Sequence, residues 1–155
     1  MSEFGHSVSL TVTTEDLPEP VNRVELDRNR KDAWGLPAPK MTYRLGENTR
    51  RMLAHGSEKA REVMAAAGAS EIIVNPLARQ AGFHFLGTAR MGNDPAVSVV
   101  NGDCVTHDID NLMVVDGSVF PTSAAVNPTP TIQAVALRAA DRLLHRLGIS
   151  EGPRA

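Results

Sequence analysis

A proline-bounded amphipathic segment near the C-terminus constrains the fold more than any other part of this chain. Thr129 is placed to cap a helix, Pro130 suits its first position and Gly148 is placed to end it. Charged side chains occupy one face of this helix and apolar side chains the other. The apolar positions are Ile132, Ala136, Ala139, Leu143 and Leu147. The segment therefore predicts a long amphipathic helix.

The first third of the chain carries the period of β-strands. Residues 7–14 alternate Val and Leu with Ser and Thr, and residues 21–27 resume this alternation. The charged run at 27–32 predicts a turn. Pro37 and Pro39 exclude a helix, and the residues that follow permit a short edge strand. Together these patterns predict an antiparallel meander.

A further helix is predicted from about Glu47 to Ala67, with Gly68 in the position that follows a helix end. Gly56 and Ser57 mark a place where it can bend. Loops are expected at 75–82 and 118–131, a turn at Asn101-Gly102, and a frayed tail at 149–155. Short strands are expected at 71–74, 97–100, 103–106 and 111–117.

Size and composition indicate one globular domain. The 155 residues are 42% hydrophobic and 22% charged, with a formal net charge of -2, which disfavours nucleic acid as a partner. Apolar runs fall far short of the ~20 residues that span a bilayer, and the first residues lack a signal-peptide pattern. We therefore expect a soluble chain without membrane insertion, cytoplasmic by default, its location otherwise unknown. The single cysteine, Cys104, excludes an internal disulfide and predicts a buried thiol.

Most of the five histidines fit ordinary structural roles. His55 and His145 lie among charged neighbours on predicted helices. His107 stands beside Asp108 and Asp110, but turns rich in Asp form for backbone reasons. No metal site is therefore predicted.

His84 differs because of the residues around it. Gly87 and Thr88 permit a sharp turn after it, and a second constrained loop delivers Asn127 directly before Pro128, which holds Asn127 extended. The helix that follows offers free N–H groups and a positive dipole end, which favour developing negative charge. A base, an amide and a helix end of this kind suit proton abstraction from an alcohol. Spacing alone leaves open whether they meet.

Three motifs in order carry a family resemblance. They are "LPEPVNRVELDRNRKDAWGLPAPKMTY", "HFLGTARMG" and "NLMVVDGSVFPTSAAVNPTPTIQAVALRAADRLL". Together they resemble the C-terminal part of glucose-methanol-choline (GMC) oxidoreductases, over about residues 8 to 147. With "VNPT" in the last loop, the chain resembles the sugar dehydrogenases and pyranose oxidases of that family more than its choline or aryl-alcohol branches.

The resemblance implies FAD as cofactor and assigns roles to individual residues. His84 matches the catalytic histidine, which accepts the hydroxyl proton as hydride leaves the substrate carbon for flavin N5. Asn127 matches the position that hydrogen-bonds the substrate oxygen. Asp116 and Gly117 match the segment along the ribityl and pyrophosphate part of FAD. Asn127, Pro128 and Thr129 match the backbone near the flavin pyrimidine ring, where the helix end faces developing negative charge.

The resemblance also implies the fold class and the domains. We expect an α+β chain in which residues 1–80 belong to an antiparallel substrate-binding domain that includes a helix. Residues 81–148 would complete a Rossmann-like FAD-binding domain and carry the catalytic pair, and residues 149–155 would form a tail. The sequence lacks the Gly-x-Gly-x-x-Gly fingerprint that receives the FAD pyrophosphate. The fold is therefore incomplete relative to the whole family, and a separate N-terminal FAD-binding polypeptide is the expected partner.

Two functions follow as alternatives. In the first, the chain is the catalytic part of a flavin-dependent oxidoreductase that oxidises a CH–OH group of a sugar or polyol, inactive by itself. In the second, it is a non-catalytic fragment or remnant that serves as a folded interaction module.

Overall fold

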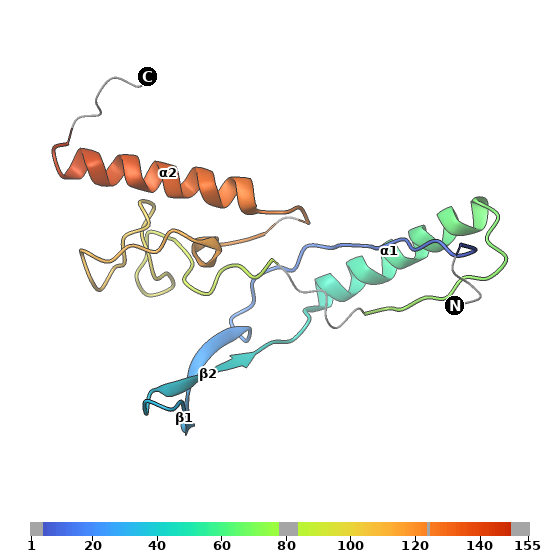
Figure 1. Cartoon of the computed structure of the whole chain (residues 1–155), viewed down its shortest axis with the longest axis horizontal. Coiled ribbons are helices and arrows are strands. Elements are labelled where there is room, and N and C mark those ends of the chain that lie inside the picture. The colour runs from blue at the N-terminus through green and yellow to red at the C-terminus, as the bar shows by residue number, and fades with distance from the viewer. Residues whose placement is uncertain (1–4, 78–83, 124, 150–155) are drawn as a thin grey trace.

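The computed structural model describes residues 5–77, 84–123 and 125–149. The elements follow in the order β1 (Arg23–Lys31), β2 (Pro37–Thr42), α1 (Glu47–Ala66), the short 3-10 helix η1 (Gly117–Val119) and α2 (Thr129–Arg146). Figure 1 shows an elongated arrangement in which α2 and the loops beneath it form one end, α1 forms the other, and the hairpin projects between them. The α+β class is confirmed in this form. That the chain completes an FAD-binding domain stays a prediction, and the expected domain boundary at 80/81 lies outside the described residues.

The two strands form one antiparallel hairpin. Val24 lies opposite Met41, and the pairing is irregular between Asp27 and Lys31. Both Val24 and Met41 are exposed, so neither is covered by another layer. The expected edge strand is confirmed within β2, but the predicted meander is reduced to this single pair of strands in the described part of the chain.

The hairpin turn lies later than the sequence suggested. Residues 27–31, where the charged run predicted a turn, belong to β1. The turn begins at Asp32. The Oδ1 atom of Asp32 accepts hydrogen bonds from the backbone N–H groups of Trp34 (2.9 Å) and Leu36 (3.0 Å). Gly35 supplies the positive φ of +83° that the turn requires. A side-chain-bonded turn with its own glycine thus decides where the strands reverse.

The strands predicted at 7–14 and 71–74 are wrong. Both segments are irregular and make no ladder with a neighbouring strand. A strand forms only where another strand satisfies its N–H and C=O groups, and the described part of the chain brings none beside either segment.

The N-terminal segment runs instead along α1, in the opposite direction to the helix (Figure 1). Val12 packs against Gly56, where an added Cβ would come within 2.5 Å of Val12 Cγ1. Further along, Thr49 Oγ1 donates a hydrogen bond to Asp16 Oδ1 at 2.6 Å, and the Tyr43 hydroxyl donates to the other oxygen of Asp16. The segment is therefore held by the helix surface and by one carboxylate.

The first predicted helix is confirmed as α1. It is continuous through Gly56 and is followed by Gly68 in the expected position, with a φ of +86°. Thr49 is the one buried residue of α1. Within the described residues, the N-terminal segment covers one side of this helix. Most of the remaining helix surface is exposed.

A small core lies between α2 and the loops beneath it. Its fully buried members are Val100, Cys104, Val119 and Ala139. The Cys104 thiol is buried as predicted, and that burial raises its pKa. Instead of the strands expected between 97 and 117, the structure has isolated bridges: Met91 with Val100, Val100 with Thr106, and Val105 with Met113.

A tight turn explains why these strands do not extend. The turn predicted at Asn101-Gly102 is confirmed: Asn101 Oδ1 accepts from the N–H groups of Asp103 (2.9 Å) and Val105 (3.1 Å). Cys104 has a φ of +64°, a left-handed conformation that a strand cannot include. The chain therefore reverses within a few residues, and the neighbouring segments pair only at single positions.

The second helix is confirmed as α2, with two differences at its ends. The N-cap is Pro128 and makes no side-chain cap bond, so the prediction that Thr129 caps the helix is wrong. Thr129 is the first helical residue, and Pro130 follows it within the first turn. Leu147, expected on the buried face, is 61% exposed. Gly148, with a φ of +67°, ends the helix as predicted.

Candidate functional site

The segment that follows His84 lies alongside η1. Successive carbonyls of η1 accept hydrogen bonds from every second N–H of that segment: Gly87 to Gly117 at 3.3 Å, Ala89 to Ser118 at 2.9 Å, and Met91 to Val119 at 2.8 Å. The tight 3-10 turn brings three consecutive carbonyls to one side, where an extended chain would present only alternate ones. The chain leaving His84 is therefore fixed to the residues just before the α2 loop.

Two glycines permit this close approach. An added Cβ at Gly117 would lie 2.7 Å from Leu86 Cδ2 and 3.2 Å from Ile132 Cδ1. Gly87 has a φ of +84°, and a Cβ there would lie 3.1 Å from the carbonyl oxygen of Phe120. Because Ile132 belongs to the first turns of α2, Gly117 is the point where the His84 segment meets the N-terminal end of this helix.

Asn127, Pro128 and Thr129 occupy that same end of α2. Asn127 and Thr129 are exposed and Pro128 is half-buried. Ile132 donates its N–H to the Pro128 carbonyl at 2.9 Å. The N–H groups of Thr129 and Thr131 lie ahead of this first helical bond, and among the described residues no side chain caps the helix start. They form a donor set at the positive end of the helix dipole.

The structure brings the two predicted catalytic segments to one end of α2 without joining their side chains. His84 is exposed, and within the described residues neither its ring nor the Asn127 amide has a hydrogen-bond partner. Both side chains are thus available to a ligand. Their roles in catalysis stay predictions.

Asp116 has a local structural role. Its Oδ1 accepts the backbone N–H of Ser118 at 2.8 Å and so caps η1. Hydrogen bonds from the Ser118 side chain and backbone lower the pKa of the Asp116 carboxyl. This carboxylate therefore stabilises the turn that carries Gly117.

An arginine of α2 fastens the helix to the loops, a contact that sequence reasoning missed. Arg138 donates to the Gly102 carbonyl at 2.5 Å and to Asp103 Oδ1 at 3.2 Å. The sequence placed Arg138 on the polar face of the helix, and no local pattern connects it to a turn so distant in sequence. The contact keeps α2 seated over the core that also holds η1.

His107 is engaged by a neighbouring loop and does not gather with its acidic neighbours. Its Nε2 atom lies 2.9 Å from Ser98 Oγ in a hydrogen bond. Thr106 Oγ1 accepts the N–H of Ile109 at 3.2 Å and shapes the Asp-containing turn. Across residues 5–77, 84–123 and 125–149, no group of three or more His, Cys, Asp or Glu side chains could hold a metal ion.

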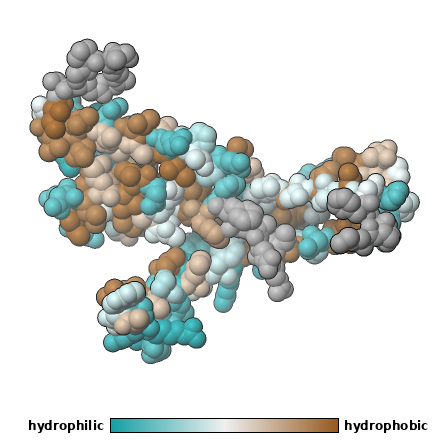
Figure 2. Space-filling model, in the orientation of Figure 1, coloured by the Kyte–Doolittle hydropathy of each residue, from teal (hydrophilic) through white to brown (hydrophobic). Residues whose placement is uncertain are grey.

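Much of the apolar surface of the chain is uncovered. Trp34 of the hairpin is 86% exposed, and Ile73 is 88% exposed. Figure 2 shows apolar side chains gathered over α2 and the loops beneath it as well. Within the described residues, no helix combines the length and apolar character that crossing a membrane requires.

Comparison with protein families and curated proteins gives consistent relatives. The family profile described as GMC oxidoreductase matches residues 18–136. The chain is 42% identical, over 92% of its length, to 2-methyl-1,2-propanediol dehydrogenase of Mycolicibacterium austroafricanum, and covers 26% of that protein. It is 38% identical, again over 92% of its length, to the fructose dehydrogenase large subunit of Gluconobacter japonicus, and covers 26% of it. The chain thus spans about a quarter of the length of these curated relatives.

A solved structure shares the fold. Pyridoxine 4-oxidase from Mesorbium loti matches with a TM-score of 0.58 and 23% sequence identity, over 74% of this chain and 26% of that one. This likeness concerns the fold alone.

Proposed function

Because the chain belongs to the GMC oxidoreductase family, we propose that it is the C-terminal catalytic part of an FAD-dependent enzyme that oxidises a CH–OH group of a sugar or another alcohol. Relatives named as dehydrogenases of a diol and of fructose support this class of substrate. One observation carries the proposal: the contact of Gly117 with both Leu86 and Ile132 brings the His84 and Asn127 segments to one end of α2.

In this proposal His84 is the general base. An imidazole nitrogen of His84 accepts the proton of the substrate hydroxyl, and bound FAD supplies the acceptor for the hydride that leaves the adjacent carbon. The exposure of the ring and its lack of a partner within the described residues support access to a substrate. The Asn127 amide donates a hydrogen bond to the substrate oxygen and orients the reacting carbon.

The residues at the α2 N-terminus fit the flavin end of FAD. The N–H groups of Thr129 and Thr131 lie ahead of the helical bond that Ile132 donates, at the positive end of the dipole. Donors of this kind suit an edge of the ring that carries carbonyl oxygens and gains negative charge on reduction. Asp116 and Gly117 would line the path towards the ribityl and pyrophosphate part.

An FAD-binding part outside these 155 residues would complete the enzyme. The chain exposes 12516 Å² of surface, whereas a compact monomer of its mass exposes about 7,600 Å². Exposed apolar side chains on this scale mark surfaces that another protein body covers. We infer that this body is an N-terminal FAD-binding part, because the sequence holds no fingerprint for the ADP half of FAD. By the same proposal residues 1–80 form part of a substrate-binding domain and residues 81–148 part of the FAD-binding domain.

The test is reconstitution. The chain would be co-expressed with a candidate polypeptide that carries the Gly-x-Gly-x-x-Gly fingerprint, and the purified complex would be screened with aldoses, glycosides, sugar acids and polyols. We expect a yellow complex whose flavin absorbance bleaches with at least one alcohol. A flavin-containing complex that no alcohol in the panel reduces would favour the non-catalytic interaction module. A yellow, active preparation of this chain by itself would contradict the need for a partner.

A further inference from the structure

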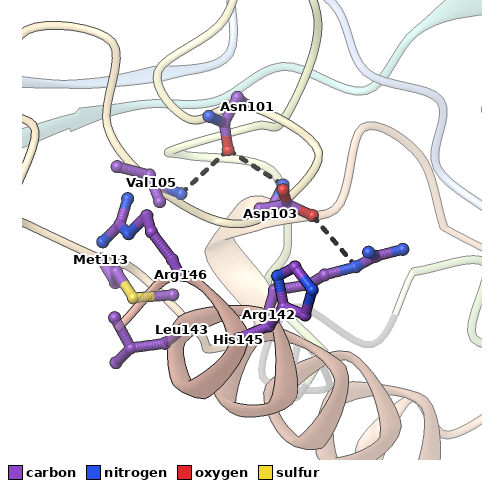
Figure 3. A pocket seen from close by; sticks show the side chains of 8 residues that line it. All are labelled: Asn101, Asp103, Val105, Met113, Arg142, Leu143, His145 and Arg146. Carbon is purple, nitrogen blue, oxygen red and sulfur yellow. Dashed lines mark hydrogen bonds and ion pairs between the residues drawn. The ribbon is translucent and has the colours of Figure 1, made fainter. Parts of the chain in front are cut away.

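An open hollow lies at the C-terminal end of α2, where the helix meets the turn at 101–105. Its volume is about 420 Å³. Figure 3 shows three cationic or titratable side chains, Arg142, His145 and Arg146, extending from the last turns of α2 towards this turn. The lining also contains the apolar side chains of Val105, Met113 and Leu143. The hollow therefore combines a basic edge with an apolar floor.

The charges of this hollow do not cancel. Its one carboxylate, Asp103, already accepts a hydrogen bond from Arg138 at 3.2 Å and lies 3.9 Å from the guanidinium of Arg142. Arg146 has no acidic partner within 4.0 Å among the described residues. Within the described residues, no carboxylate therefore balances the positive charge of Arg146, and this charge attracts an anionic group.

The apolar surface extends beyond the hollow. Leu147 follows Leu143 by one helical turn on the same face and is 61% exposed. Ile149 is 52% exposed, and its N–H donates to the Leu144 carbonyl at 3.0 Å, which fixes it against the helix end. A small anion would neutralise Arg146 but leave Leu147 and Ile149 in water. A peptide segment that carries both carboxylates and apolar side chains would cover both kinds of surface.

We propose that this α2-end surface, formed by Arg142, Leu143, Arg146, Leu147 and Ile149, binds an acidic segment of a partner polypeptide that also carries leucine-like side chains. Its carboxylates pair with Arg146 and with the outer side of Arg142, and its apolar side chains cover Leu143, Leu147 and Ile149. The inference does not rest on the catalytic proposal. The length of α2 separates this surface from the N-terminal end of the helix by roughly 25 Å, so a segment bound here leaves that end free.

The experiment uses the full chain and a fluorescein-labelled synthetic peptide in which pairs of Glu alternate with pairs of Leu. Fluorescence anisotropy would be measured at low and high salt, with a Lys/Leu peptide of the same pattern as the control probe. We expect the acidic peptide to bind and the basic one not to bind, with affinity falling as salt screens the charges. Arg146→Glu should weaken binding by about tenfold or more, because it places like charges in contact.

Arg30→Glu is the matched control variant, since it makes the same charge change on exposed β1, away from the hollow. It should leave the affinity within about twofold, because surface charges beyond the screening length interact weakly. Leu147→Gln should also weaken binding, and circular dichroism would verify that each variant is folded. Equal losses in the Arg146 and Arg30 variants would overturn the proposal, because net charge would then explain binding. No binding of the acidic peptide, or displacement by citrate with no effect of Leu147→Gln, would overturn it as well.

Discussion

Gly117 lies directly against Ile132, so close that a Cβ on the glycine would be 3.2 Å from the Cδ1 atom of the isoleucine. On its other side the same position meets Leu86. This one contact links the segment after His84, the turn capped by Asp116, and the first turns of α2. The geometry of the candidate site therefore depends on the absence of a side chain at residue 117.

The first prediction concerns this contact. Gly117→Ala should lower the free energy of unfolding by about 1–3 kcal/mol, because the new methyl group forces Leu86 and Ile132 to move. Gly102→Ala is the matched control: a Cβ there meets nothing within 4 Å, so we expect a change within about 0.5 kcal/mol. Urea unfolding followed by circular dichroism measures both. Equal stabilities of the two variants would contradict the tight packing at Gly117.

The second prediction concerns the proposed base. In the reconstituted enzyme, His84→Ala should slow flavin reduction by about 10²–10⁴-fold while FAD stays bound, because a general base typically contributes this much. Stopped-flow absorbance measures the rate, and the flavin spectrum measures occupancy. His55→Ala, an exposed histidine of α1, should leave the rate unchanged. Loss of FAD from the His84 variant with normal chemistry in the remaining holoenzyme would refute the assignment.

The third prediction orders the two site residues. Asn127→Ala should slow flavin reduction less than His84→Ala does, because a lost hydrogen-bond partner typically costs about 0.5–1.5 kcal/mol, or roughly tenfold in rate. The same stopped-flow measurement, made as a function of substrate concentration, separates binding from chemistry. An Asn127 variant slower than the His84 variant would reverse the roles that we propose.

The fourth prediction concerns pH. Burial, the hydrogen bond to Asp16 and the negative charge of Asp16 together raise the pKa of the Tyr43 hydroxyl to about 12. The neutral phenol is therefore favoured in the folded state. The stability it contributes is fully present below pH 10.0, the ordinary pKa of tyrosine, and is lost as pH rises towards 12.

Tyr43 is the single tyrosine of the chain, so phenolate absorbance reports it without overlap. We expect its titration midpoint near pH 12 in the folded chain and a lower midpoint in Asp16→Asn, which removes the negative charge. In Tyr43→Phe, which has no hydroxyl to ionise, the free energy of unfolding should fall less as pH rises from 10.0 towards 12. A midpoint at the ordinary pKa of tyrosine would show that Asp16 does not hold the hydroxyl.

The helices were predictable because their signals are local. For α1 and α2, apolar spacing fixed the extent, and Gly68 and Gly148 fixed the ends. The error at the start of α2 was a single position, since Pro128 and not Thr129 is the N-cap. Backbone bonds within a helix join residues four apart, so a short window of sequence contains most of what decides it.

The strands were predictable only where a partner was adjacent. β1 and β2 follow one another and form a hairpin, whereas residues 7–14 and 71–74 have equally strand-like patterns and remain irregular. Alternation of apolar and polar residues indicates which side chains share a face. It does not indicate whether another strand lies beside the backbone to pair with it. For the first of these segments, the neighbour proved to be α1, with Val12 against Gly56.

The sequence by itself determined the two helices, the adjacent hairpin, the buried Cys104, and the motifs by which the family is identified. Only the tertiary structure decided that the His84 segment lies against Gly117 and Ile132, and that Arg138 reaches the turn at Asp103. These contacts join residues far apart along the chain. They form only when burial of Val100, Cys104, Val119 and Ala139 offsets the entropy of closing the loops between them.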